Sequence, residues 1–241
     1  SVAYKRSRKV SGRLVRGVGF LMKKHNIDVH MGTAKLTAKD TIEVTQEKGE
    51  TETLKAKNII IASGSHPFTI PGVELDGEKV IEFETAILRD ELPESAAIIG
   101  GGAIGVEFAT IWSAYGVKIT IIEMLDSLLP LEDPEVGAEV QKAYKKRGIK
   151  IMTKSKVKGV ETTDKGTKVT VETEDGEEVV EAELTLVAIG FRPNSKGLGL
   201  EEIGVNIDRR GYIEIDERMA TNVDGIYAIG DVTGKLLLAH V

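Results

Sequence analysis

The chain has 241 residues, of which 29% are charged and 41% are hydrophobic, and its formal net charge is −6. This composition is typical of a soluble globular protein, and the acidic balance argues against nucleic acid as a partner of the whole chain. No apolar run approaches the roughly 18–20 residues of a membrane span, and no signal peptide is recognised. We therefore expect no membrane association and a cytoplasmic location.

The chain contains no cysteine, and its four histidines show no metal-ligand spacing. Structural disulfides and thiolate catalysis within this chain are therefore excluded, and we predict no metal site. The chain lacks an initiating methionine and begins inside a predicted helix. We therefore expect it to be a fragment.

The first 27 residues are strongly basic, with no acidic residue before Asp28. One interpretation is a patch that binds anions or nucleic acid. The interpretation that we favour is the solvated face of an amphipathic helix that ends near His25 and Asn26. The basic residues are Lys5, Arg6, Arg8, Lys9, Arg13, Arg16, Lys23 and Lys24, and the expected buried side holds Val10, Leu14, Val18 and Leu21 or Met22.

Short strands are predicted next at residues 28–31, 41–45 and 53–55, as a small antiparallel piece with Gly49 in its turn. Residues 58–65 form a continuous apolar run that ends in small residues, which is typical of a parallel strand buried on both faces. Pro67, Pro71 and Gly72 then interrupt the pattern, and we expect the chain to cross between domains there.

A glycine fingerprint follows the predicted strand at residues 96–99. Gly100, Gly102 and Gly105 have G-x-G-x-x-G spacing, and a helix predicted over residues 102–115 ends at Gly116. A second strand, residues 117–122, ends on Glu123, which lies 21 residues after Gly102. This is the full pattern of a dinucleotide-binding βαβ unit, in which the helix N-terminus faces the pyrophosphate.

Glu123 predicts which nicotinamide cofactor is bound. A carboxylate at the end of the second strand accepts hydrogen bonds from the ribose hydroxyls and repels a 2′-phosphate. The next residue is Met124, so no arginine follows immediately to receive a phosphate. The sequence therefore favours NAD over NADP.

The βαβ pattern continues to a third strand and then changes. Asp133 and Pro134 begin a second helix that Gly148 ends, and a strand is predicted at residues 149–153. A β-meander is predicted at residues 167–174 and 177–181, then buried strands at 184–190 and 226–231. Asp231 ends the last strand, where it either binds a second ligand's hydroxyls or caps the strand.

Four motifs in this order resemble the flavoprotein disulfide reductases that have two dinucleotide-binding domains. They are Ile61-Ala62-Ser63-Gly64-Ser65, the glycine fingerprint with Glu107, Ala188-Ile189-Gly190-Phe191-Arg192-Pro193-Asn194 and Ala228-Ile229-Gly230-Asp231. The run at residues 234–240 resembles the dihydrolipoamide dehydrogenase branch of this family. The resemblance covers essentially the whole chain.

The resemblance implies two cofactor sites and no catalytic acid, base or nucleophile among the residues present. For NAD it implicates Gly100, Gly101, Gly102, Ala103, Ile104, Gly105, Val106 and Glu107, with Glu123 on the ribose, Val157 near the adenine and Gly190 near the nicotinamide. For FAD it implicates Ala34, Ser63, Gly64, Ser65, Asp231, Leu237, Leu238, Ala239 and His240.

The implied fold is α/β, with a Rossmann-like NAD-binding domain (βαβαβ plus a β-meander) inserted in an incomplete FAD-binding domain. The expected boundaries are residues 1–73 and 196–241 for the FAD-binding parts and 74–195 for the NAD-binding domain. The family's FAD pyrophosphate loop, its redox-active cysteine pair and its dimer-interface domain have no counterpart in the sequence. We therefore expect weak or no flavin binding by this chain.

The implied function of the intact protein is that of an NAD-linked, FAD-dependent oxidoreductase of the dihydrolipoamide dehydrogenase type. It would convert dihydrolipoamide and NAD to lipoamide and NADH as a homodimer, with dihydrolipoyl domains of 2-oxo acid dehydrogenase complexes as possible partners. Two alternatives stay open: a mercuric reductase or NADH oxidase on the same scaffold, or a non-catalytic NAD-binding module.

Overall fold

The structure is a computed structural model that describes residues 2–238, and it contains two compact units. Unit 1 comprises residues 1–8 and 67–190, and unit 2 comprises residues 9–66 and 191–241. Each unit has its own buried apolar cluster or clusters, so each is described by itself.

Unit 1 is built on a five-stranded parallel sheet with the order β6-β13-β7-β8-β9. The strand order reverses between β7 and β13, because the chain proceeds outward from β7 through β8 to β9 and then returns to β13 on the other side. The strands are β6 (Val80–Ile81), β7 (Ser95–Ile99), β8 (Lys118–Ile122), β9 (Lys150–Met152) and β13 (Leu184–Val187).

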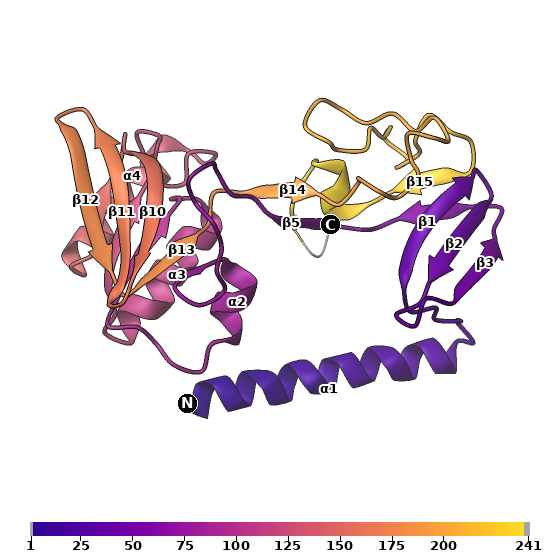
Figure 1. Cartoon of the computed structure of the whole chain (residues 1–241), viewed down its shortest axis with the longest axis horizontal. Coiled ribbons are helices and arrows are strands. Elements are labelled where there is room, and N and C mark those ends of the chain that lie inside the picture. Colours follow the sequence, from indigo (N-terminus) through magenta and orange to yellow (C-terminus); the bar gives the residue numbers. More distant parts are fainter. Residues whose placement is uncertain (1, 239–241) are drawn as a thin grey trace. The chain divides into compact units, whose positions relative to one another are not determined.

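Helices and a second sheet cover the two faces of this parallel sheet (Figure 1). In β7, Ala96 and Ile98 pack with helix residues such as Trp112, whereas Ala97 and Ile99 pack against the other sheet. Burial on both faces explains why the strands are continuously apolar. The helices are α2 (Phe83–Leu88), α3 (Ala103–Ala114) and α4 (Pro134–Lys146).

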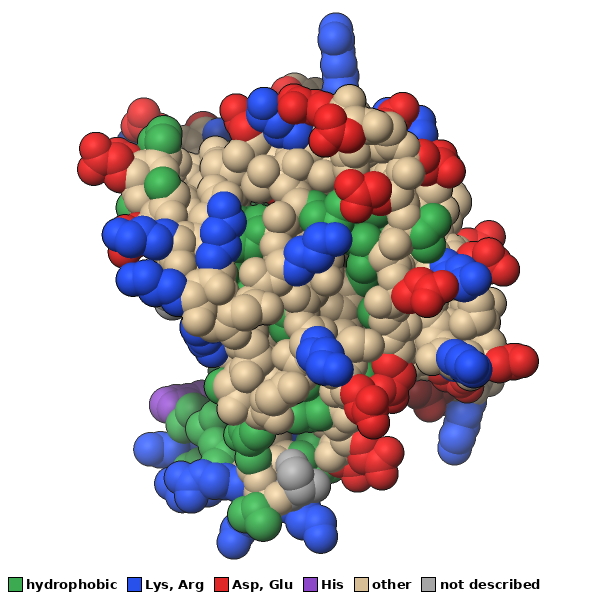
Figure 2. Space-filling view, turned by 90° about the vertical axis from the view of Figure 1, so that its left-hand side faces the viewer, with side chains coloured by type: hydrophobic (Ala, Val, Ile, Leu, Met, Phe, Trp, Pro, Cys, Tyr) green, Lys and Arg blue, Asp and Glu red, His purple; other side chains and the backbone are tan. Residues whose placement is uncertain are grey.

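The second sheet of unit 1 is an antiparallel meander of β10 (Lys156–Thr163), β11 (Gly166–Thr173) and β12 (Gly176–Ala182). Its inner face contributes Val157, Val169, Val171 and Val180 to the core. Its outer side carries cross-strand ion pairs such as Lys158–Glu172 at 3.0 Å. In the upper part of the face drawn in Figure 2, basic and acidic side chains are interspersed.

Unit 2 contains three small sheets. One is antiparallel, one is the parallel pair β15-β4, and one is the pair β14-β5 at the unit boundaries of residues 66–67 and 190–191. Leu36, Ile59, Ile61, Ile213 and Ile226 are among its buried residues. The elements are β1 (Thr33–Ala38), β2 (Thr41–Thr45), β3 (Thr51–Lys55), β4 (Ile59–Ile61), β5 (Ser65–Pro67), β14 (Phe191–Pro193), β15 (Ile226–Ala228) and the 3-10 helix η1 (Gly230–Thr233).

The βαβαβ prediction is confirmed, including its helix ends. The Asp133 carboxylate accepts a hydrogen bond from the Glu135 N–H at 3.0 Å, and Pro134 is the first residue of α4. Gly116 and Gly148 follow α3 and α4 with φ of +91° and +80°, as glycines that end helices do. The elements β5, β6, α2, β10 and β14 are not among the predicted ones. Four of them have only two to six residues, too few for a periodic signal, and the pattern of β10 is interrupted by a bulge between Val157 and Gly159.

The prediction for the first helix is only half right. The basic segment forms α1 (Val2–Lys24), but none of its residues is buried, and Leu14 is 66% exposed. The expected burial of Val10, Leu14, Val18, Leu21 or Met22 is therefore wrong for the described residues. An amphipathic pattern shows that a helix can bury one face, but burial also needs a packing partner.

Two strand predictions in unit 2 also need correction. Residues 28–31 form no strand, and the first strand begins at Thr33 instead. The predicted strand at residues 58–65 is paired over β4 and again only at Ser65, the first residue of β5, and Ile60 is 62% exposed between the buried Ile59 and Ile61. The prediction that this strand is buried on both faces is therefore wrong. Among the described residues, no helix is long and apolar enough to cross a membrane.

The central core position of β13 gives a stability prediction. Leu186 is fully buried, so Leu186→Ala should lower the free energy of unfolding by about 3 kcal/mol through lost burial and a residual cavity. The matched control is Leu131→Ala at a side chain that is 96% exposed, where the change should stay within about 0.5 kcal/mol. Urea unfolding followed by circular dichroism measures both, and equal changes would contradict this core assignment.

Candidate functional site

The carboxyl ends of β7 and β13 meet at Gly100. Ala188 N–H donates to the Ile99 carbonyl at 2.8 Å, and Gly100 N–H donates to the Ile122 carbonyl at 2.9 Å. Gly100 has φ +108°, and a Cβ there would lie 2.3 Å from the Ala188 carbonyl oxygen, so only glycine fits. This is the point at which the strand order reverses, where open α/β sheets bind their ligands.

The other fingerprint glycines have two different roles. A Cβ on Gly105 would lie 2.0 Å from the Gly100 carbonyl oxygen, and one on Gly101 would lie 2.5 Å from Leu128 Cδ2, so both glycines permit close packing. Gly102 has no atom within 4 Å of a Cβ position, and its φ of −74° suits any residue. Packing does not require glycine at position 102. Its absent side chain leaves space in front of helix α3.

The N-terminus of α3 faces this space without a side-chain cap. Gly102 is the N-cap residue, and the first intrahelical bond runs from Val106 N–H to the Gly102 carbonyl at 3.0 Å. The N–H groups of Ala103, Ile104 and Gly105 therefore have no intrahelical partner. Such N–H groups, together with the positive end of the helix dipole, form a binding site for an anion such as a pyrophosphate.

Glu123 is a buried carboxylate beside the fingerprint, with 8% of its surface exposed. Its Oε2 accepts from Gly101 N–H at 2.6 Å, and its Oε1 accepts from Leu125 N–H at 2.8 Å. None of the ion pairs among the described residues includes Glu123. Each carboxylate oxygen has a second lone pair, so the group retains the capacity to accept from two ribose hydroxyls.

The remaining predicted NAD residues are placed as follows. Glu107 is exposed on α3, and Gly190 is exposed after β13, where its carbonyl accepts from Phe68 N–H at 2.9 Å. Val157 is buried in the core with Ile122 and Met152. Its side chain therefore offers little surface to an adenine, and contact there would have to come from the backbone.

A second polar cluster lies in unit 2, where β4 and β15 end side by side. Ser65 Oγ donates to Asp231 Oδ2 at 2.9 Å, and Ser63 Oγ donates to the Asn194 carbonyl at 2.7 Å. Gly64 between the two serines has φ +69°. The structure thus brings together Ser63, Gly64, Ser65 and Asp231, which the family resemblance assigns to FAD.

Asn194 belongs to this cluster but was not among the predicted site residues. Its backbone N–H donates to the Gly64 carbonyl at 3.0 Å, and its Nδ2 donates to the Ser63 carbonyl at 2.9 Å. Its Oδ1 lies 2.7 Å from His66 Nδ1. The available signal was its position in the motif that ends in Pro193-Asn194, directly after a strand.

The other predicted FAD residues lie apart from these bonds or beyond the described chain. Ala34 is exposed in β1 opposite Val44, and Leu237 and Leu238 are also exposed. Ala239 and His240 lie outside the described residues.

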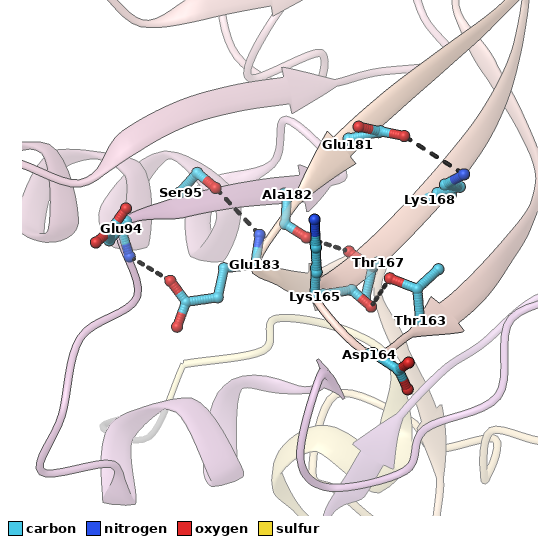
Figure 3. Close-up of a pocket in the computed structure, with 11 residues that line it drawn as sticks. Glu94, Ser95, Thr163, Asp164, Lys165, Thr167, Lys168, Glu181, Ala182 and Glu183 are labelled. Atoms are coloured by element: carbon cyan, nitrogen blue, oxygen red, sulfur yellow. Dashed lines mark hydrogen bonds and ion pairs between the residues drawn. The ribbon is translucent and has the colours of Figure 1, made fainter.

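A hollow of about 670 Å³ lies at the opposite, amino ends of β7 and β13 (Figure 3). Its polar groups bond largely to one another: Glu183 accepts from Glu94 N–H at 2.7 Å, and Ser95 Oγ accepts from Glu183 N–H at 3.1 Å. These bonds connect the amino end of β7 to the residue before β13. Residues 2–238 contain no group of three or more acidic or histidine side chains that could hold a metal ion.

The parallel sheet, the uncapped helix and the buried carboxylate define a dinucleotide-binding fold. The profile of the pyridine nucleotide-disulphide oxidoreductase family matches residues 2–241, and the chain belongs to this family. It is 47% identical to dihydrolipoyl dehydrogenase of Mycobacterium leprae over 245 residues, which cover 100% of this chain and 52% of the relative. It is 45% identical to the Corynebacterium glutamicum dihydrolipoyl dehydrogenase over 99% of this chain and 51% of that protein.

A crystal structure of LpdA from Mycobacterium tuberculosis superposes with a TM-score of 0.91 at 28% identity. The match covers 99% of this chain and 52% of LpdA. The chain therefore has the α/β fold of this family and is a dihydrolipoyl dehydrogenase homologue. It spans about half the length of the relatives that it matches.

A substitution of Gly102 tests ligand binding without disturbing the packing, because no atom lies within 4 Å of its Cβ position. Gly102→Ala should leave the free energy of unfolding within about 0.5 kcal/mol, but the added methyl group should weaken NADH binding about tenfold or more. Fluorescence titration with NADH measures the affinity. Gly17→Ala, at another open glycine in α1, is the control and should not change it. Unchanged NADH affinity in Gly102→Ala would place the pyrophosphate elsewhere.

Proposed function

We propose that the intact protein is an NAD-linked, FAD-dependent oxidoreductase of the dihydrolipoamide dehydrogenase type, and that this chain supplies NAD binding and part of FAD binding. The reaction is the conversion of dihydrolipoamide and NAD to lipoamide and NADH. The observation that carries the proposal is the joint presence of the Gly100–Glu123 site and the Ser65–Asp231 cluster in a member of this family.

The residues of unit 1 fit NAD. The α3 N–H groups would bind the pyrophosphate in the space left by Gly102. Glu123 would accept hydrogen bonds from the hydroxyls of the adenosine ribose. The positions of Glu107 and Gly190 suit the nicotinamide half, where NAD supplies the hydride-transfer chemistry when it is bound. None of the ion pairs among the described residues includes Glu123, so its negative charge would repel a 2′-phosphate nearby.

The residues of unit 2 fit FAD in part. Asp231 would accept hydrogen bonds from hydroxyls of the ribityl chain or lie near the phosphates. Ser63, Gly64 and Ser65 would line the FAD site beside Asp231. Ala34 and residues 237–240 are proposed on the wider analogy with the family. No second glycine-rich pyrophosphate loop occurs in the sequence, so flavin binding by this chain should be weak.

The proposed domain arrangement is an NAD-binding domain at residues 74–195 inserted between FAD-binding parts at 1–73 and 196–241. It is supported by the crossing of the chain between the two compact units at residues 66–67 and 190–191. For the intact protein we also propose a cytoplasmic homodimer that accepts dihydrolipoyl domains.

The first experiment is the absorbance spectrum of the purified chain, followed by titration with NADH and NADPH. NADH binding well above NADPH supports the NAD assignment, and bleaching of a yellow sample by NADH would show that flavin and hydride transfer are both present. A sample indifferent to both cofactors would contradict the proposed function for this chain.

Glu123 should set the preference between the two cofactors. In Glu123→Gln the negative charge is removed with little change in volume, so NADPH should bind better relative to NADH by about tenfold, equivalent to about 1.4 kcal/mol. The control, Glu135→Gln at an exposed residue of α4, should keep the wild-type ratio. An unchanged ratio in Glu123→Gln would show that its charge does not select the cofactor.

A further inference from the structure

From the bonds around the second polar cluster we infer that Asn194 is a positioning residue: its side chain fixes the turn of residues 63–65 so that Ser65 holds the Asp231 carboxylate. This inference rests on the proposed FAD-side site. It assigns to that site a residue from the returning segment of the chain, 131 residues after Ser63.

The hydrogen bonds of Asn194 determine the orientation of its amide. The Ser63 carbonyl oxygen is only an acceptor, so the atom 2.9 Å from it must be the Nδ2 donor. Oδ1 therefore faces His66, whose Nδ1 lies 2.7 Å away and must carry a proton. The side chain thus joins Ser63 to His66 across the turn with one donated and one accepted bond.

The backbone of Asn194 holds the same turn from the other side. Its N–H donates to the Gly64 carbonyl at 3.0 Å, and its carbonyl accepts from Ser63 Oγ at 2.7 Å. Asn194 therefore bonds to three of the four residues from Ser63 to His66. The fourth, Ser65, is left to donate to Asp231 at 2.9 Å.

The turn depends on its hydrogen bonds because little else fixes its backbone. Gly64, at φ +69°, is conformationally permissive, and β4 before it is only three residues long. Without the bond from Nδ2, the partly buried Ser63 carbonyl would lose a partner within the protein. Without this bond the turn keeps the two bonds to the Asn194 backbone but loses the one that orients the Ser63 carbonyl, so Ser65 would be held less closely against Asp231.

The test compares two asparagines of unit 2 that make the same kind of bond. Asn222 Nδ2 donates to the Gly204 carbonyl at 2.7 Å, away from the cofactor cluster. In Asn194→Asp and Asn222→Asp the shape is preserved and the donor is replaced by a carboxylate oxygen, which cannot donate to a carbonyl. The full chain is titrated with FAD and with NADH, and backbone amide chemical shifts are recorded by NMR.

We expect Asn194→Asp to weaken FAD binding tenfold or more, to shift the amide signals of Gly64, Ser65 and Asp231, and to leave NADH affinity unchanged. Asn222→Asp should change neither affinity. If the wild-type chain binds no FAD but Asn194→Asp still shifts those three signals, the positioning role stands and the flavin proposal fails. Wild-type signals in Asn194→Asp, or an equal loss of NADH affinity, would overturn the inference.

Discussion

The close approach of helix α3 to the end of strand β7 is the constraint on which the first binding site depends. The absent side chain of Gly105 allows the helix to lie against the Gly100 carbonyl, where a Cβ would be only 2.0 Å from that oxygen. A helix that starts this close to the strand end directs its free N–H groups toward the open space at Gly102. One backbone contact thereby sets both the packing of unit 1 and the direction of its anion-binding groups.

The buried Glu123 carboxylate also stabilises the loop that leads from β7 to α3. A buried carboxylate is unfavourable unless hydrogen bonds satisfy it, and Gly101 and Leu125 supply these bonds from the two loops that follow β7 and β8. The carboxylate therefore joins the loop after β7 to the loop after β8. In the proposed function the same carboxylate also accepts hydrogen bonds from the adenosine ribose, so one side chain would serve both the packing of the loops and the choice of cofactor.

The features that could be predicted from the sequence are those determined by neighbouring residues. The fingerprint, the Asp133 cap and the glycines after α3 and α4 each depend on a few adjacent positions, and the structure contains them. Residues 27–31 show the limit of such reasoning. Ile27, Val29 and Met31 alternate as a strand would, yet they are 50%, 60% and 78% exposed and pair with no strand of the described chain. Strand formation requires a partner that a local pattern does not reveal. The same holds for Asn194, whose partners are more than 120 residues away in sequence.

The pairing of β5 with β14 has an evolutionary consequence. These strands include the points where the chain leaves unit 2 and returns to it, so the intervening 67–190 segment begins and ends on adjacent, hydrogen-bonded strands. A segment with neighbouring ends can be gained, exchanged or removed without separating the strands that flank it. The segment 67–190 is therefore arranged as an insertion whose two ends join unit 2 side by side.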